Sequence, residues 1–264
     1  IMIMLIVSSG FDTLIAAPAV APWDSAAVDW TSALEVLIAS NLSWWAYTGA
    51  MVRNSPSARS SLWPVVFGLG LAVGVGSLTG LYGALLQPDS GGDPTQYLVD
   101  VGGPVFGVIA LVFIVLANIG TALVGAYAST IAFRQIRVIR KLSWFTSTWI
   151  TILPALVLVG LFSDFVFSSF GTFLSLLGLA FAPMCGIQII DYFLLRRQRL
   201  DVGSIYRNDA DSQYWYWGGF NIVGFIAFVA GAAVYLYLLD PVTYVSRPPF
   251  EFMTATIPSL LASA

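Results

Sequence analysis

The sequence predicts an all-α polytopic membrane protein, and three observations lead to this fold class. Charged residues make up only 9% of the 264 residues, whereas hydrophobic residues make up 58%; an average soluble domain is about 25% charged. The mean hydropathy is +0.84. The apolar residues fall into runs close to the ~20 residues that a helix needs to cross a bilayer core. Helices satisfy their own backbone hydrogen bonds in lipid, so these runs are expected to be transmembrane helices.

Composition also excludes several classes of function. The sequence has no histidine and a single cysteine, Cys185. An internal disulfide is therefore excluded, as are most zinc and haem sites and every Ser-His or Cys-His catalytic pair. The net charge of −3 does not indicate the basic character that nucleic-acid-binding proteins have. We expect a protein of the lipid bilayer that is not an enzyme and has no cofactor, apart from a possible coupling cation.

We expect a single transmembrane region over residues 1–264 with about eight helical segments. The first segment is partial and ends between Val7 and Ile15; it lacks the charged start of a signal peptide. We expect further helices to precede it, so that the chain is a fragment. The remaining segments are predicted at Thr31–Val52, Leu62–Leu86, Pro104–Phe133, Trp144–Phe162, Phe167–Leu195, Tyr214–Leu239 and Phe250–Leu261. The last is short, and we expect it to be truncated or loosely embedded.

The basic residues support this order of helices. Lysine and arginine gather in the cytoplasmic loops of membrane proteins, and ten of the eleven here fall in alternate loops. We therefore predict that the loops at 53–61, 134–143 and 196–213 are cytoplasmic and that the protein lies in the plasma (cell inner) membrane. The cluster Tyr214–Trp217 would then form an aromatic belt at the inner interface.

The segment Thr31–Val52 is predicted to be a broken transmembrane helix. Ser40, Asn41 and Ser43 come just before two adjacent indoles, Trp44 and Trp45. Polar groups at membrane depth cost free energy unless they are satisfied within the protein or line a wet cavity. We predict that Asn41, Ser43, Trp44 and Trp45 line a small-molecule site, together with Asn118 from the Pro104–Phe133 segment.

The depth of Trp44 supports a binding role. At ~1.5 Å per residue, Trp44 lies roughly 22 Å from Asp29 and roughly 13 Å from Arg53, two charged residues that bracket the helix. That position is inside the hydrocarbon core, away from the interfacial belts. The indoles are suited to stacking on a flat ligand. The alternative is that both are large side chains packed between helices.

A second cluster of small and polar residues lies in the segment Pro104–Phe133. Asn118 and Thr121 are three residues apart and share a helix face. With Gly120, they could offer oxygen atoms to a cation such as sodium, which prefers oxygen ligands. The alternative is ordinary packing of small residues between transmembrane helices.

Two acidic residues near helix ends have competing interpretations. Glu35 lies six residues after Asp29. It could be a gating or proton-handling carboxylate, but we expect a residue at the rim of the membrane. Asp191 lies five residues before Arg196, and we expect the two to form a structural ion pair; the alternative is a proton relay.

The segment near residue 190 resembles a known family. The run Phe173-Leu-Ser-Leu-Leu-Gly-Leu-Ala-Phe-Ala-Pro183-Met-Cys-Gly186-Ile-Gln-Ile-Ile-Asp191-Tyr192-Phe-Leu-Leu-Arg196-Arg197 resembles a late-helix signature of the nucleobase:cation symporters (NCS1, the purine-cytosine permease and hydantoin transporter family). Tyr214-Trp-Tyr-Trp-Gly-Gly-Phe-Asn221 fits the same family. The resemblance covers essentially the whole chain, which would correspond to the end of helix 5 through helix 12.

The resemblance implies a LeuT-like (APC superfamily) inverted-repeat fold, incomplete in this chain, with broken helices at the site. The implied function is symport of a purine, pyrimidine, hydantoin or related heterocycle with Na+ or H+. Ser43-Trp44 would match the family's ring-stacking position. Ala117, Gly120 and Thr121 would match positions of sodium ligands. Of these three, Thr121 has the one side-chain oxygen, so both cations stay open.

Two other functions stay open on the sequence. An amino-acid or amine transporter of the same superfamily would keep the fold and change the cargo. A non-catalytic membrane subunit would not need polar residues beside Trp44. Which heterocycle is carried depends on a few pocket atoms, and the sequence does not identify it.

Overall fold

The computed structural model describes residues 2–17, 25–90, 93–207 and 209–264. Parts of the predicted connections at 17–30, 87–100 and 196–213 lie outside these residues. The helices, with η1 and η3 π-helical and η2 a 3-10 turn, are α1 (Met2–Ser9), α2 (Phe11–Ala16), α3 (Ala26–Ser43), α4 (Trp45–Val52), α5 (Ala58–Val65), η1 (Val66–Ala72), α6 (Val73–Leu86), η2 (Pro88–Ser90), α7 (Pro94–Phe133), α8 (Arg137–Arg140), α9 (Trp144–Leu161), α10 (Ser163–Ser168), α11 (Phe170–Ile189), η3 (Ile190–Leu195), α12 (Val202–Ile205), α13 (Ile222–Leu238), α14 (Phe250–Met253) and α15 (Thr256–Ala262).

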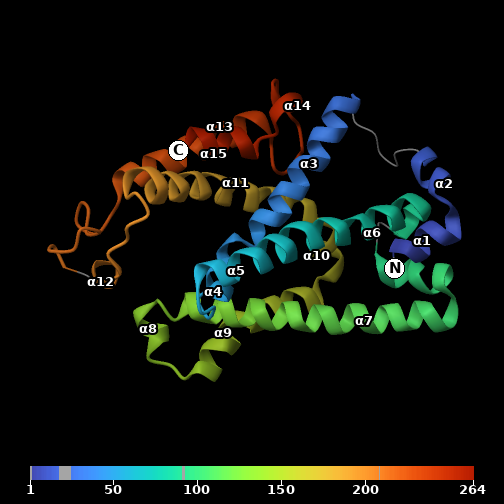
Figure 1. The fold of residues 1–264 in the computed structure, drawn as a ribbon, viewed down its shortest axis with the longest axis horizontal. Coiled ribbons are helices and arrows are strands. Elements are labelled where there is room, and N and C mark those ends of the chain that lie inside the picture. Colours follow the sequence, from blue (N-terminus) through green and yellow to red (C-terminus); the bar gives the residue numbers. More distant parts are fainter. Residues whose placement is uncertain (1, 18–24, 91–92, 208) are drawn as a thin grey trace. The chain divides into compact units, whose positions relative to one another are not determined.

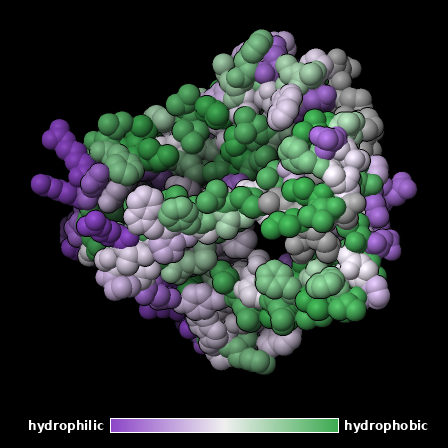
Figure 2. Space-filling model, turned by 45° about the vertical axis from the view of Figure 1, so that its right-hand side comes forward, coloured by the Kyte–Doolittle hydropathy of each residue, from purple (hydrophilic) through white to green (hydrophobic). Residues whose placement is uncertain are grey.

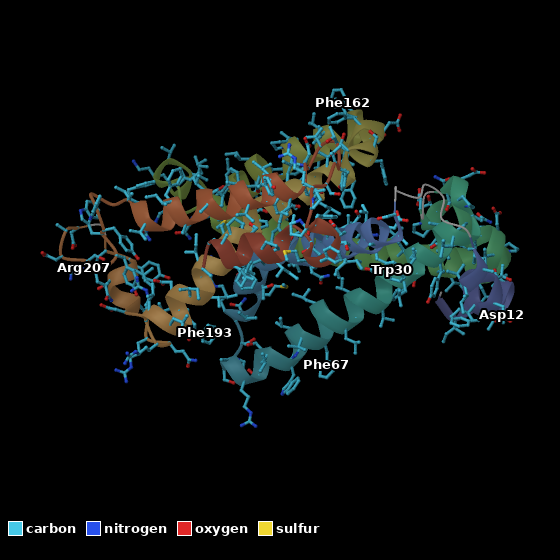
Figure 3. All side chains as sticks on the ribbon, turned by 90° about the horizontal axis from the view of Figure 1, so that it is seen from above. Asp12, Trp30, Phe67, Phe162, Phe193 and Arg207 are labelled. Carbon is cyan, nitrogen blue, oxygen red and sulfur yellow. The ribbon has the colours of Figure 1, made fainter. Side chains whose placement is uncertain are left out.

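The structure confirms the all-α membrane class. Within the described part of the chain, four continuous helical stretches are long and apolar enough to cross a membrane: Ala58–Leu86, Pro94–Phe133, Trp144–Leu161 and Phe170–Leu195. The helix Ile222–Leu238 is apolar but shorter. Large apolar side chains such as Phe67, labelled in Figure 3, are exposed, and hydrophobic residues cover much of the face in Figure 2. Apolar surfaces of this extent mark contact with lipid or with other protein. The helical architecture is consistent with the predicted LeuT-like fold.

The chain divides into two compact units, which are described separately. The first consists of residues 1–22 and 46–163. In it, α1 packs on α6 and α7, and the long helix α7 lies beside α9 (Figure 1). Leu5, Tyr97 and Leu98 form a buried core, where the Tyr97 hydroxyl donates to the Thr79 carbonyl at 3.3 Å. This core ties the start of α7 to α6.

The second unit consists of residues 23–45 and 164–264. Its central element is α11, on which α3, α13 and α15 all pack (Figure 1). Two glycines make this close packing possible. A Cβ atom at Gly186 would collide with the backbone carbonyl of Leu260, and one at Gly231 would lie 2.7 Å from the Pro183 side chain. Helix backbones approach this closely only where one side chain is absent.

A buried carboxylate holds the second unit together. Glu35 on α3 is 1% exposed. Its Oε2 accepts the backbone N–H groups of Ala255 (2.9 Å) and Thr256 (3.0 Å), and its Oε1 accepts the Thr256 hydroxyl (2.6 Å). The first amides of a helix have no partner within the helix, and a carboxylate there also complements the helix dipole. We call this arrangement the Glu35 clasp; the expected position at the rim of the membrane stays a prediction.

The last predicted segment is two short helices rather than one. Thr254, with φ 63° and ψ −173°, separates α14 from α15. The expectation of a loosely embedded end was wrong, because α15 packs on α11 and α13. Ser259 and Ser263 are buried and donate to the carbonyls of Gly231 (2.8 Å) and Pro183 (3.0 Å). These hydroxyls satisfy backbone groups of neighbouring helices.

The start of the Pro104–Phe133 segment also differs from the prediction. The helix α7 already begins at Pro94, where the Asp93 side chain accepts the N–H of Thr95 at 2.9 Å. Its non-helical residue is Gly103 (φ 70°, ψ 177°), directly before Pro104. The predicted start is therefore the point where the helix resumes. The helical turns before Gly103 form because Tyr97 and Leu98 pack into the core of the first unit.

The Tyr214–Leu239 segment is shorter than predicted, since α13 begins at Ile222. Gly218 and Gly219 have φ of 63° and 91°, values that favour glycine and end helical structure before this point. The Asn221 side chain then caps the new helix by accepting the N–H of Gly224 at 3.0 Å. The aromatic residues 214–217 precede the helix.

We expect Glu35→Gln to destabilise the protein. The substituted amide would place a donor against amide and hydroxyl donors, and an unsatisfied buried donor costs about 1–3 kcal/mol. The apparent Tm of the purified protein that contains this chain should fall by about 5–10 °C. Glu251→Gln, the same change of atoms and charge on α14, is the matched control. An equal, small shift in both variants would show that the clasp does not stabilise the unit.

Candidate functional site

The predicted break in the Thr31–Val52 helix is present and consists of one residue. The helix α3 ends at Ser43 and α4 begins at Trp45. Between them, Trp44 has φ −80° and ψ −9°, and its N–H bonds to the carbonyl of Asn41 at 3.1 Å. The break is therefore a single tight turn and not an unwound stretch. It separates the directions in which the two indoles can point.

The Trp45 side chain reaches α11. Its indole Nε1 donates to Oε1 of Gln188 at 3.0 Å. The two side chains line a cavity of ≈ 340 Å³, which we call the α11 pocket; its lining residues are Trp45, Gln188, Ile189, Tyr192, Phe193 and Leu200. Small-molecule sites occupy about 300–1,000 Å³ and combine apolar walls with a few polar groups. The α11 pocket fits this description and has room for one small ring compound.

The end of α11 shapes this pocket. The helix changes to π geometry at η3, which carries Tyr192 and Phe193, the latter labelled in Figure 3. The two rings are 5.0 Å apart at an angle of 82°. Single π-helical turns occur frequently at functional sites. Here the turn places two adjacent aromatic side chains at the cavity.

Arg196 fixes the end of η3. As predicted, it forms an ion pair with Asp191, with 2.7 Å between Nε and Oδ2. Its Nη2 also donates to the Tyr216 hydroxyl at 2.8 Å, and its guanidinium lies 4.3 Å from the centre of the Tyr214 ring. A planar guanidinium can bond a carboxylate and stack on a ring at the same time. The aromatic residues placed at the inner interface by the sequence therefore hold the end of α11.

The other residues predicted on α3 bond within their own helix. The Asn41 amide donates to the Leu37 carbonyl at 2.9 Å, and the Ser43 hydroxyl donates to the Ser40 carbonyl at 2.6 Å. Trp44 is half-buried. Of the four residues predicted from this segment, Trp45 lines the α11 pocket. The roles of Asn41, Ser43 and Trp44 stay predictions.

The residues predicted for a cation lie on one stretch of α7 in the first unit. Ala117, Asn118, Gly120 and Thr121 are exposed there. The Thr121 hydroxyl donates to the Ala117 carbonyl at 3.2 Å. One hydroxyl and two helix carbonyls could supply part of an oxygen-ligand set. The hydroxyl is already engaged within the helix, so the stretch fits a sodium site only partly.

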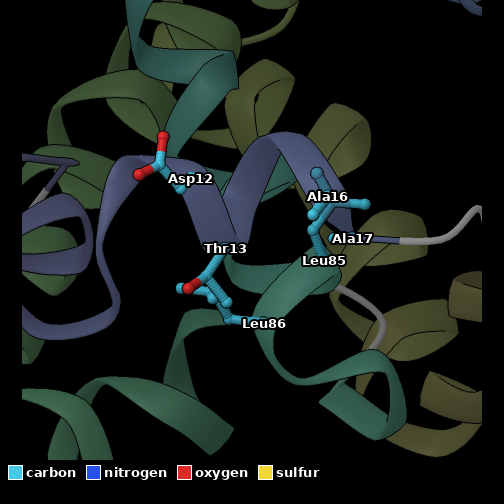
Figure 4. Close-up of a pocket in the computed structure, with 6 residues that line it drawn as sticks. All are labelled: Asp12, Thr13, Ala16, Ala17, Leu85 and Leu86. Atoms are coloured by element: carbon cyan, nitrogen blue, oxygen red, sulfur yellow. The ribbon is translucent and has the colours of Figure 1, made fainter.

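A larger cavity of ≈ 570 Å³ lies in the first unit, between α2 and the end of α6 (Figure 4). Its walls include Thr13, Ala16 and Leu86, and the Asp12 carboxylate points away from the leucines in the close-up. Among the residues that the structure describes, its lining includes no aromatic ring on which a flat ligand could stack. The α11 pocket is therefore the better candidate.

Sequence reasoning did not select Gln188 and Tyr192. The available signal was a lone amide within an apolar run, between Ile187 and Ile189, with Tyr192 four residues later. Residues four apart share a helix face. The sequence could not show which residue contacts that face, because the contact with Trp45 joins residues 143 positions apart.

These features define a multi-span helical membrane protein with an aromatic pocket that contains one amide. A family model described as "Permease for cytosine/purines, uracil, thiamine, allantoin" matches residues 2–257. The chain belongs to this family, which confirms the resemblance seen in the sequence. The description of the family is that of permeases.

Individual relatives carry related names. The chain is 37% identical over 90 residues to a hydantoin permease of Microbacterium maritypicum (34% of this chain, 16% of the relative). It is 26% identical over 209 residues to a purine-uracil permease of Arabidopsis thaliana (74% and 34%), and 36% identical over 64 residues to an allantoin permease of Bacillus subtilis (24% and 13%). The chain thus spans at most 34% of these relatives. No solved structure matches it.

We expect Arg196→Lys to loosen the end of η3. Lysine keeps the charge but loses the planar fork that bonds Asp191 and Tyr216 and stacks on Tyr214. Limited digestion with proteinase K should cut the 196–213 segment several-fold faster. Arg197→Lys, at an exposed neighbouring position, is the control. Equal cutting of both variants would contradict the anchoring role of Arg196.

Proposed function

We propose that the protein containing this chain is a secondary active transporter that carries a nucleobase-like heterocycle together with a cation. One observation carries this proposal: a chain of the permease family has a ring-sized pocket in which Trp45 and Gln188 are hydrogen-bonded to each other. Purines, pyrimidines and hydantoins are flat and polar at their edges. An aromatic wall and an amide match both properties. The relatives' names, which include hydantoin, purine-uracil and allantoin permeases, support the same class of cargo.

We place ring stacking at Trp45 rather than Trp44. The resemblance put the stacking position at Ser43-Trp44, but Trp45 is the indole that lines the α11 pocket. Its side chain is 39% exposed, so one part of the ring is available to a ligand. Its Nε1 is held by Gln188, which limits rotation of the indole. A fixed aromatic surface loses little conformational entropy when a ligand binds.

The coupling cation is proposed to be Na+ or H+. Thr121, with the carbonyls of Ala117 and Gly120, would contribute part of a sodium site and would need ligands from elsewhere in the protein. Glu35, the other carboxylate considered for proton handling, accepts three hydrogen bonds in the clasp. We therefore assign Glu35 a structural role and do not propose it as the proton carrier.

The charge pattern supports one orientation in the membrane. We propose that residues 53–61, 134–143 and 196–213 face the cytoplasm in the plasma (cell inner) membrane, since these segments carry ten of the eleven basic residues. The α11 pocket, whose lining includes Leu200 of the 196–213 segment, would then lie toward the inner side.

We expect Trp45→Ala to reduce heterocycle uptake strongly and Trp44→Ala to reduce it less. Stacking of a base on an aromatic side chain contributes about 1–3 kcal/mol, which corresponds to a loss of at least about fivefold. Uptake of radiolabelled uracil, hydantoin and allantoin by cells producing the full-length protein measures the effect, with surface expression as the control. The reverse ranking of the two variants would place the stacking position at Trp44.

Uptake is expected to depend on a cation gradient. Sodium is replaced by choline at fixed pH in one set of cells, and a proton uncoupler is added in another. Loss of concentrative uptake without sodium, accompanied by a weaker sodium response in Thr121→Ala, would identify Na+. Loss with the uncoupler alone would identify H+. Concentrative uptake that resists both treatments would contradict cation coupling, and competition by amino acids but not heterocycles would favour the amino-acid alternative.

A further inference from the structure

The amide of Gln188 has a fixed orientation. An indole N–H is a donor and never an acceptor, so the group that faces Trp45 at 3.0 Å is the amide oxygen Oε1. The Nε2 group, with two N–H donors, must then point away from that contact. The oxygen has a second lone pair, which the indole does not use. Gln188 therefore has amide donors and a spare acceptor lone pair within one planar group.

We propose that Gln188 is a specificity-determining residue that recognises ring compounds with an N–H directly beside a C=O. This inference rests on the proposed function and names the chemical feature of the cargo that the α11 pocket selects. The Nε2 donor would bond the ring carbonyl, and the Oε1 lone pair would accept the ring N–H. The donor and the acceptor of the amide side chain thus match the acceptor and the donor of such a ring edge.

The walls of the pocket strengthen the selection. Ile189, Phe193 and Leu200 offer no hydrogen-bonding side chain, so among the lining residues the Gln188 amide and the Tyr192 hydroxyl are the groups left to bond the edge of a bound ring. If the ring nitrogen carried a methyl group, Oε1 of Gln188 would have no ring N–H to accept. The Gln188 amide would then be poorly paired in a largely apolar cavity. Sites built around a polar group discriminate strongly against ligands that leave it unpaired.

The recognition of the ring edge is coupled to Trp45. Removing the indole N–H while keeping an aromatic ring, as in Trp45→Phe, would free the Gln188 amide to rotate. The ring would still stack, but the donor and acceptor would no longer be presented in one orientation. A substitution at either residue should thus affect the same discrimination. Residues that act through one hydrogen bond give non-additive effects when both are changed.

The test measures selectivity rather than activity alone. Uptake and binding of uracil or hydantoin are compared with those of the analogue methylated at the recognised nitrogen, in the full-length protein and in purified protein. We expect a preference of about tenfold or more for the unmethylated ring. Gln188→Leu should reduce this preference to about twofold or less, mainly by weakening binding of the unmethylated ring. Gln135→Leu, an exposed glutamine at the end of α7, is the matched control.

Two further variants keep the test decisive. Gln188→Glu retains an acceptor for Trp45 but removes the donor for the ring carbonyl, so it should lose the preference even if Gln188→Leu folds poorly. The combination of Trp45→Phe with Gln188→Leu should lose no more selectivity than the larger single effect. Unchanged selectivity in both Gln188 variants, with normal uptake, would overturn this inference and leave the proposed function standing. No binding or uptake of any heterocycle by the unaltered protein would overturn both.

Discussion

The second unit depends on the burial of one carboxylate. Glu35 lies on α3, and its partners lie at the start of α15, 220 and 221 residues later in the chain. A buried charge is tolerated only when hydrogen bonds replace its lost hydration. The seven residues of α15 are too few for a stable helix by themselves. The contact therefore serves both partners, because the carboxylate gains donors and the short helix gains a cap. A second link, from the Thr31 hydroxyl to the Glu251 carbonyl at 2.8 Å, joins α3 to α14 beside it.

The α11 pocket is built on this support. The helix α3 carries the chain to Trp45, and α11 carries Gln188, Tyr192 and Phe193. Both helices are held in the same packed unit. Arg196 then fixes the far end of η3 through a carboxylate, a hydroxyl and a ring. The pocket residues themselves are exposed, so they do not form a closed core. Most of them lie on helices, which favours one defined geometry for a ligand.

The sequence predicted the features that depend on local composition. Apart from the start of α7, the apolar runs gave the spans from Ala58 to Leu195 to within a few residues, and the spacing of Asp191 and Arg196 predicted their ion pair. The polar residues before Trp44 predicted the helix break. The errors arose where distant contacts decide the outcome. The hydrogen bonds of Glu35 were not predicted because its partners near residue 255 could not be known, and the early start of α7 depends on Tyr97 packing into a core. Gln188 was not selected because its partner is Trp45.

The division of α11 has a consequence for how such a protein can change during evolution. Its buried residues lie between Leu174 and Gly186, and a neighbouring backbone is pressed against Gly186. Its last turns, from residue 188 onward, are largely exposed and face the pocket. Substitutions that alter ligand preference can thus accumulate at one end of the helix without disturbing the packing at the other. A scaffold with stability and selectivity assigned to separate ends of one helix can acquire new cargo while keeping its fold.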